Sequence, residues 1–213
     1  MNRVGQVAWA YDLAKRLLEE PLPRRWAHTQ GVGKRAETLA PILGADADTL
    51  VAAAYLHDIG YSPQLVDTGF HPLDGARYLR DVHQADETLC RLVAHHSCAV
   101  NEALERSLFD ALTSEFEKER PQLMDALTYS DMTTGPDGHH LEVTERLAEI
   151  HSRYGPDHLV SRSITASTPC ITAAVVAVEA ALAGKHAGPW HALSRCVAQA
   201  DADCPALRGG RQG

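Results

Sequence analysis

The chain has 213 residues, of which 45% are apolar and 23% are charged. This composition is typical of a soluble globular protein, and the length suits one domain with a substantial core. The formal net charge of −8 does not suit a general nucleic-acid-binding protein, whose affinity would depend on a basic face that neutralises phosphates. We therefore expect no nucleic acid polymer as a partner.

Membrane and redox signals in the sequence point to a cytoplasmic protein. Residues 1–6 lack the basic start and apolar run of a signal peptide, and no segment offers about 20 uncharged apolar residues for crossing a membrane. The cysteines are odd in number and lack CxxC spacing, so we expect free thiols rather than a disulfide framework or a Cys-rich zinc site. These cysteines are Cys90, Cys98, Cys170, Cys196 and Cys204.

Apolar residues recur at spacings of three and four along almost the whole chain, which predicts a nearly all-helical fold. Pro169 is expected to interrupt the last apolar stretch, leaving a short packing helix that contains Glu179 and does not span a membrane. The tail from Pro205 is expected to be disordered. The predicted helices cover residues 7–19, 24–43, 46 or 48 to 58, 72–81, 86–97, 101–118, 121–131, 141–154 and 170–184.

Ionisable residues on the apolar faces of these helices are the main functional signal. A single buried His is more often a hydrogen-bonded core residue, and a single Asp is often a cap. Buried carboxylates beside several imidazoles, however, would cost several kcal/mol each without a positive partner. Asp and neutral His suit Mn, Fe, Co, Ni or Zn, and the absence of thiolate favours a catalytic site. The residues are His28, His57, Asp58, His96 and Asp131, with His95 at the edge of its apolar stripe.

The order of His28, His57-Asp58 and Asp131 resembles the H…HD…D signature of HD-domain metal-dependent phosphohydrolases, and the string HDIG strengthens the resemblance. RWAHTQGV is similar to the Arg-x-x-His helix of that superfamily, and FHPLDGARYL and LVAHHS are similar to the segments with its two further histidines. The match covers about residues 24–137. It implies an all-α HD-domain helical bundle. Residues 138–204 lie beyond the match, and we expect them to add C-terminal helices to a single domain over residues 1–204.

The resemblance also implies one or two divalent transition-metal ions. His28, His57, Asp58 and Asp131 would hold one ion, and His71 and His96 would hold a second, with Asp58 as the bridging ligand. His95 could replace or join His96, because related subfamilies have a His-His pair at this point. Two ions about 3.5 to 4 Å apart would clamp a phosphoryl group and share a hydroxide nucleophile. Arg25, one helical turn before His28, would pair with a phosphate oxygen.

The expected substrate is a nucleotide or another small phosphoester or phosphoanhydride. The pattern is similar to that of bacterial diadenosine tetraphosphate hydrolases of this superfamily, but Tyr61-Ser62 stands where those enzymes commonly have a Lys. Two alternatives stay open: an HD-fold di-iron oxygenase, and a non-catalytic module that binds a nucleotide or a partner. Residues 138–204 could complete the bundle, cover the pocket or form a homodimer interface.

Overall fold

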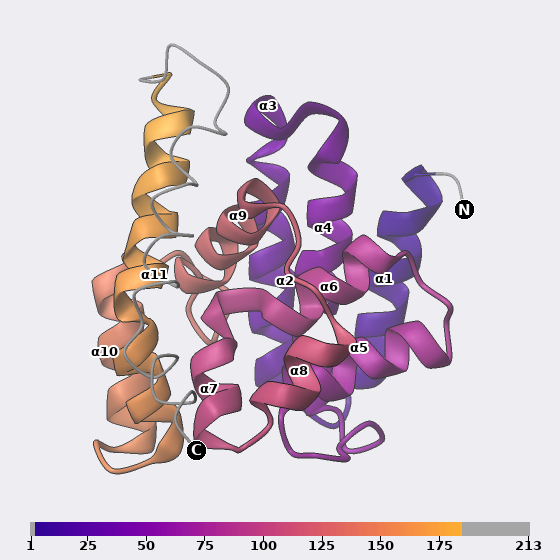
Figure 1. Ribbon diagram of the computed structural model, residues 1–213. Coiled ribbons are helices and arrows are strands. Elements are labelled where there is room, and N and C mark those ends of the chain that lie inside the picture. The colour runs from indigo at the N-terminus through magenta and orange to yellow at the C-terminus, as the bar shows by residue number, and fades with distance from the viewer. Residues whose placement is uncertain (1–2, 185–213) are drawn as a thin grey trace.

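The computed structural model describes residues 3–184, and regular structure in this range is helical (Figure 1). An isolated bridge pairs Thr134 with His140, and no strand forms among the described residues. The prediction of an all-α fold is therefore confirmed. Cys196, Cys204 and the tail from Pro205 lie outside the described residues.

The α-helices and the short 3-10 helices follow the predicted order closely. The α-helices are α1 (Arg3–Leu18), α2 (Pro23–Glu37), α3 (Ala40–Leu43), α4 (Ala47–Leu56), α5 (His71–Asp81), α6 (Glu87–His95), α7 (Val100–Glu105), α8 (Phe109–Glu115), α9 (Pro121–Met132), α10 (Val143–Tyr154) and α11 (Leu159–Leu182). The 3-10 helices are η1 (Gly44–Asp46), η2 (Ile59–Tyr61) and η3 (His96–Cys98).

Two predicted helices are each divided into two. The helix predicted over residues 24–43 ends at Glu37, where the Thr38 hydroxyl donates to the Arg35 carbonyl at 2.6 Å. The helix predicted over residues 101–118 breaks between α7 and α8, where Ser107 has a φ of 60°. This left-handed conformation cannot continue an α-helix. Spacing alone predicted both stretches as continuous because apolar residues continue across each break.

α4 is the centre of the fold. Its residues 50–56 are all buried, and it packs against α1, α2, α6 and α9. Close packing with α2 depends on Gly33, because a Cβ atom there would lie 2.4 Å from the Tyr55 ring. A helix that is apolar on every side is buried on every side. Its C-terminal end therefore delivers His57 and Asp58 into the protein interior.

α11 is one continuous helix that contains Pro169, so the predicted interruption is wrong. Proline removes one N–H donor and crowds the carbonyl four residues earlier. The Thr168 hydroxyl donates to the Ile164 carbonyl at 2.8 Å, and the Thr165 hydroxyl donates to the Ser161 carbonyl at 2.9 Å. Both halves of the helix bury side chains against the bundle, from Ser161 to Val178. Tertiary packing on both sides of the proline thus outweighs its local cost.

The expectation that no segment is long and apolar enough to cross a membrane is also corrected. Within the described range, α11 has the necessary length and composition, with a mean hydropathy of 1.5 over 18 residues. The bent pair Pro23–Glu37 and Ala40–Tyr61 passes the same test, with a bend of 53°. α11 lies beside α9 and α10 in the bundle (Figure 1), and 33% of its apolar window is buried. Core helices pass this test as well, so it is weak evidence for a membrane span.

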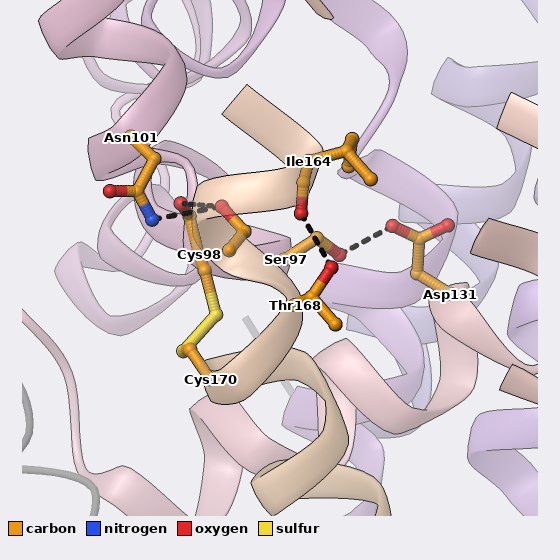
Figure 2. The surroundings of a disulfide bond; sticks show 8 residues. Ser97, Cys98, Asn101, Asp131, Ile164, Thr168 and Cys170 are labelled. Carbon is orange, nitrogen blue, oxygen red and sulfur yellow. Dashed lines mark hydrogen bonds between the residues drawn. A yellow bond between two sulfur atoms is a disulfide. The ribbon is translucent and has the colours of Figure 1, made fainter. Parts of the chain in front are cut away.

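A disulfide joins Cys98 in η3 to Cys170 in α11, which corrects the expectation of free thiols (Figure 2). The two residues are 72 positions apart in the sequence, and they meet because α11 packs against η3 and α7. Beside the disulfide, Asn101 donates to the Ser167 hydroxyl at 2.9 Å. Cys90 is free and buried, as predicted.

Candidate metal centre

The fold gathers six of the predicted ligands from separate helices into two adjacent groups. In each group the candidate donor atoms all lie within 4.8 Å of one another. The side chains come from α2, the C-terminal end of α4, the first residue of α5, η3 and the end of α9. The first group is His28, His57 and Asp131, and the second is Asp58, His71 and His96.

Asp58 belongs to the second group and also faces the first. Its Oδ2 is 3.2 Å from His57 Nε2 and 3.8 Å from His28 Nε2, both in the first group. Its Oδ1 is 3.4 Å from His71 Nε2 in the second group. One carboxylate thus presents a different oxygen to each group, which is the arrangement that a bridging ligand requires.

Backbone carbonyls orient three of the histidines. The Nδ1 atom of His57 lies 2.7 Å from the Ala54 carbonyl oxygen, and that of His96 lies 2.7 Å from the Val93 carbonyl oxygen. The Nδ1 atom of His28 lies 3.0 Å from the Gly135 carbonyl oxygen. Because a carbonyl can only accept, Nδ1 carries the proton and Nε2 keeps its lone pair for the centre. Metal-bound histidines are commonly held in this way.

Two further contacts test whether a cation fits. The Nε2 atom of His57 is fully buried, and the Asp58 Oδ2 atom 3.2 Å away does not have hydrogen-bond geometry with it. The Nε2 atoms of His71 and His96 lie 3.1 Å apart. A buried imidazole nitrogen without a partner is costly. One metal ion in each group would give these three nitrogens a positive partner. The donor set of imidazole nitrogen and carboxylate oxygen fits a divalent transition metal.

Neighbouring groups keep the two carboxylates of the site ionised, which is the form that binds metal ions. Burial disfavours the ionised form of Asp58, but Arg25 and His57 outweigh it and hold its pKa well below the usual range. Burial is likewise outweighed at Asp131, where His28, whose Nε2 lies 3.0 Å from Asp131 Oδ1, lowers the pKa. Metal ligands must be deprotonated before they bind, and both carboxylates meet this condition.

Burial is the main influence on the pKa values of three of the four histidines. Burial lowers the pKa of His28 and His96, and it lowers that of His71 well below the ordinary value. His57 differs: burial lowers its pKa, but the adjacent Asp58 more than compensates and raises it overall. Three of the four rings are therefore neutral near pH 7, as metal ligation requires.

The loop before α5 places His71. The buried Asp74 carboxylate accepts hydrogen bonds from the backbone N–H groups of residues 67–69, at 3.0 to 3.2 Å. At Gly60, a Cβ atom would lie only 2.0 Å from the His71 carbonyl oxygen. The glycine of the HDIG string is therefore needed for the close approach of η2 to the start of α5, which sets the position of His71 beside Asp58.

His95 is buried but belongs to neither group. Its Nε2 donates to the Phe116 carbonyl at 2.7 Å, so its ring is tied to the segment after α8. Of the two neighbouring histidines, His96 is the one that lies at the centre. Its position on the apolar stripe had favoured it as the ligand.

Arg25 lies beside the centre. Its Nη1 donates to Asp58 Oδ2 at 2.8 Å, and its guanidinium group lies 4.1 Å from the centre of the Tyr61 ring. Tyr61 in turn stacks on His71, with ring centroids 3.9 Å apart. Sequence reasoning noted Tyr61 only as a departure from related enzymes. Its position three residues after Asp58 was the available signal for a role at the site.

Ser97 was missed altogether. Its hydroxyl donates to Asp131 Oδ2 at 2.5 Å (Figure 2), and its φ of 49° turns the chain sharply after His96. Its position next to a predicted ligand was the sole signal, since a serine by itself predicts nothing about a site.

The C-terminal helices form a wall of the site. A cavity of about 90 Å³ next to the centre is lined by residues of both groups and by α10 and α11, including Arg146, Ile150, Tyr154 and Ile164. A second cavity, of about 310 Å³, lies on the side of Arg25 and His28. Of the roles considered for residues 138–204, the described part, residues 138–184, packs against the bundle and lines the pocket.

The helical bundle and its two His/Asp groups define a class of all-α protein with side chains suited to divalent metal ions. The sequence model of the HD domain family matches residues 25–132, and the chain belongs to this family. The predicted superfamily is thus confirmed, and residues after 132 lie beyond the match.

Similarity to individual proteins is confined to part of the chain. Two proteins called Ribonuclease Y, from Lactobacillus helveticus and Lactobacillus acidophilus, are each 37% identical to it over 70 residues. The match covers 33% of this chain and 13% of each relative, so the chain spans a small part of their length. No solved structure matches the chain.

Proposed function

We propose that the protein is a metal-dependent phosphohydrolase that acts on a nucleotide or another small phosphoester or phosphoanhydride through a dinuclear His/Asp centre. The observation that carries the proposal is the position of Asp58, whose two oxygens face the two groups separately. An isolated inward carboxylate would need one cation, whereas this carboxylate lies between two sets of donors. His28, His57 and Asp131 would hold one ion, and His71 and His96 the other.

Two bound divalent ions would polarise a phosphoryl group and supply a hydroxide nucleophile. The chain itself contributes orientation and charge. Arg25 now pairs with Asp58, and a phosphate that entered the cavity would give its guanidinium fork a second anionic partner. The Tyr61 ring under the guanidinium group limits its movement. Arg25 would therefore hold a phosphate oxygen beside the centre.

The substrate that we propose is small. The cavity next to the centre is bounded by α10 and α11, and the net charge of −8 disfavours a long polyanion. The name of the two Lactobacillus relatives denotes enzymes that cleave RNA, which supports phosphoester hydrolysis as the reaction class. Their match covers 70 residues, so it supports the chemistry of the centre more than their polymeric substrate. A dinucleoside polyphosphate, as in the hydrolases that the sequence resembles, belongs to the proposed class.

The test is phosphate or nucleotide release from nucleotides, dinucleoside polyphosphates and p-nitrophenyl phosphate, with Mn or Fe supplied. We expect metal-dependent turnover that falls by at least about 100-fold in Asp58→Asn, as expected for loss of a group that acts in the transition state. Asp110→Asn, which alters an exposed carboxylate on α8, should retain full activity. Thermal denaturation gives a second readout: saturating Mn should raise the midpoint of the wild type by roughly 5 to 10 °C and leave that of Asp58→Asn unchanged.

Two results would contradict the proposal. Equal metal-induced shifts in the wild type and in Asp58→Asn would show that the bridging carboxylate binds no ion. Iron-dependent oxygen consumption without phosphoester turnover would replace the hydrolase with the di-iron oxygenase.

A further inference from the structure

Two arginines of α10 lie after residue 132, where the match to the HD domain family ends. Arg146 and Arg153 each line both the cavity next to the metal centre and the second, larger cavity. The larger cavity also takes Arg24 and Arg25 into its wall, so it has four guanidinium groups around about 310 Å³. No carboxylate lines it among the residues that the structure describes. Arg24 pairs with Asp137 at 2.9 Å and Arg25 pairs with Asp58 at 2.8 Å, both outside this wall. The two arginines of α10 are therefore the guanidinium groups to consider for an anion.

The arginines of α10 are not fully neutralised by their neighbours. Arg146 Nη1 donates to Glu149 Oε2 at 2.5 Å, and Arg153 Nη2 donates to the same oxygen at 2.6 Å. Arg153 Nε donates to Glu149 Oε1 at 3.0 Å. One carboxylate therefore serves two guanidinium groups. An anion in the cavity would give each of these groups a further partner.

Arg146 gives the stronger evidence for a ligand. It is 4% exposed, and its Nε has no hydrogen-bond partner within residues 3–184. A buried charged donor without a partner is costly, and natural proteins keep such groups chiefly where a ligand satisfies them. The guanidinium fork matches the geometry of phosphate oxygens, which can accept two of its N–H groups at once.

We propose that the larger cavity is a subsite for a second phosphate group of the substrate, held by Arg146 and Arg153. The preferred substrates would then have at least two phosphate groups, one at the metal centre and one in this subsite. Arg25 lines both cavities and lies between the two positions. The volume is at the lower end of the range for ligand pockets, about 300 to 1,000 Å³. Pro21, Leu22 and Pro136 supply an apolar wall for the uncharged part of the molecule.

Binding to the metal-free protein tests the subsite without requiring turnover, although the identification of its ligand as a substrate rests on the proposed function. Titration calorimetry in EDTA would measure the affinity for tripolyphosphate and for inorganic phosphate. We expect tripolyphosphate to bind more tightly than phosphate, and Arg153→Gln to weaken tripolyphosphate binding by at least about tenfold, as expected for the loss of a charged hydrogen bond. Arg146→Gln should have a similar or larger effect. Because Arg146 is buried, circular dichroism must show that this variant folds, and Arg153→Gln carries the test if it does not.

Arg162→Gln is the matched control. Arg162 lies on α11, pairs with Glu105 at 2.7 Å and lines neither cavity, so its loss should leave tripolyphosphate affinity unchanged. An equal loss in Arg162→Gln and Arg153→Gln, or unchanged affinity in Arg153→Gln and in folded Arg146→Gln, would overturn the subsite.

Kinetics separates the failure of this inference from the failure of the proposed function. With metal supplied, Arg153→Gln should lower kcat/KM for ATP at least about tenfold more than it lowers kcat/KM for p-nitrophenyl phosphate, which has a single phosphate group. Equal losses for both substrates would overturn the inference and leave the hydrolase intact. Tripolyphosphate binding that depends on Arg153, in a protein that hydrolyses no phosphoester, would support the anion subsite and overturn the proposed function.

Discussion

The disulfide between Cys98 and Cys170 should be a major source of stability. It closes a segment of 72 residues, and the loss of chain entropy in the unfolded state for a loop of this length corresponds to about 4 kcal/mol at 25 °C. For a chain of this size each kcal/mol moves the thermal midpoint by about 2 to 4 °C. Replacing both cysteines with serine should therefore lower the midpoint by roughly 8 to 16 °C.

Circular dichroism during heating, with and without dithiothreitol, would measure this effect. Reduced wild type should unfold near the midpoint of the Cys98→Ser/Cys170→Ser variant, and the variant should not respond to dithiothreitol. A peptide map without reduction should contain the linked peptides. A linked wild type with the same midpoint before and after complete reduction would refute the entropy argument, and a map without the linked peptides would refute the pairing itself.

Three further changes test the core and the centre. Burial raises the pKa of Asp125 to about 6, above the unfolded value of about 3.9, so stability is lost as pH rises from about 4 to 7. Asp125→Asn should remove this pH dependence, which amounts to about 2 to 3 kcal/mol in the free energy of unfolding measured with urea at pH 4.5 and 7.5. Parallel pH profiles of stability in the wild type and the variant would contradict it. Gly60→Ala should displace His71 and reduce turnover at least about tenfold; full activity would show that η2 can shift. His96→Gln should reduce the Mn-induced rise in midpoint, because the second ion loses a ligand, while His95→Gln keeps the full rise; the reverse would exchange their roles.

The local spacing of apolar residues was sufficient to predict most of the helices. The apolar run that forms α4 and the stripe that forms α6 lead to His57 and His96, which directly follow the two helices and are buried, because helical geometry decides which residues share a face up to the helix end. Helix ends were less predictable. The break at Ser107 and the continuation through Pro169 depend on backbone conformation and packing, which the apolar pattern does not contain.

The sequence by itself determined the helical class and most of the candidate ligands, because residue type and periodicity specify which polar groups enter the core. The family and the remaining ligand, His71, came from the resemblance of its motifs. Tertiary structure decided which helix each buried face meets. It placed the oxygens of Asp58 between two groups, turned His95 toward Phe116, paired Cys98 with Cys170, and brought Arg146 to a cavity beside His28. Each of these contacts joins residues far apart in the chain or selects between neighbours, and such choices depend on the packing of whole helices rather than on local spacing.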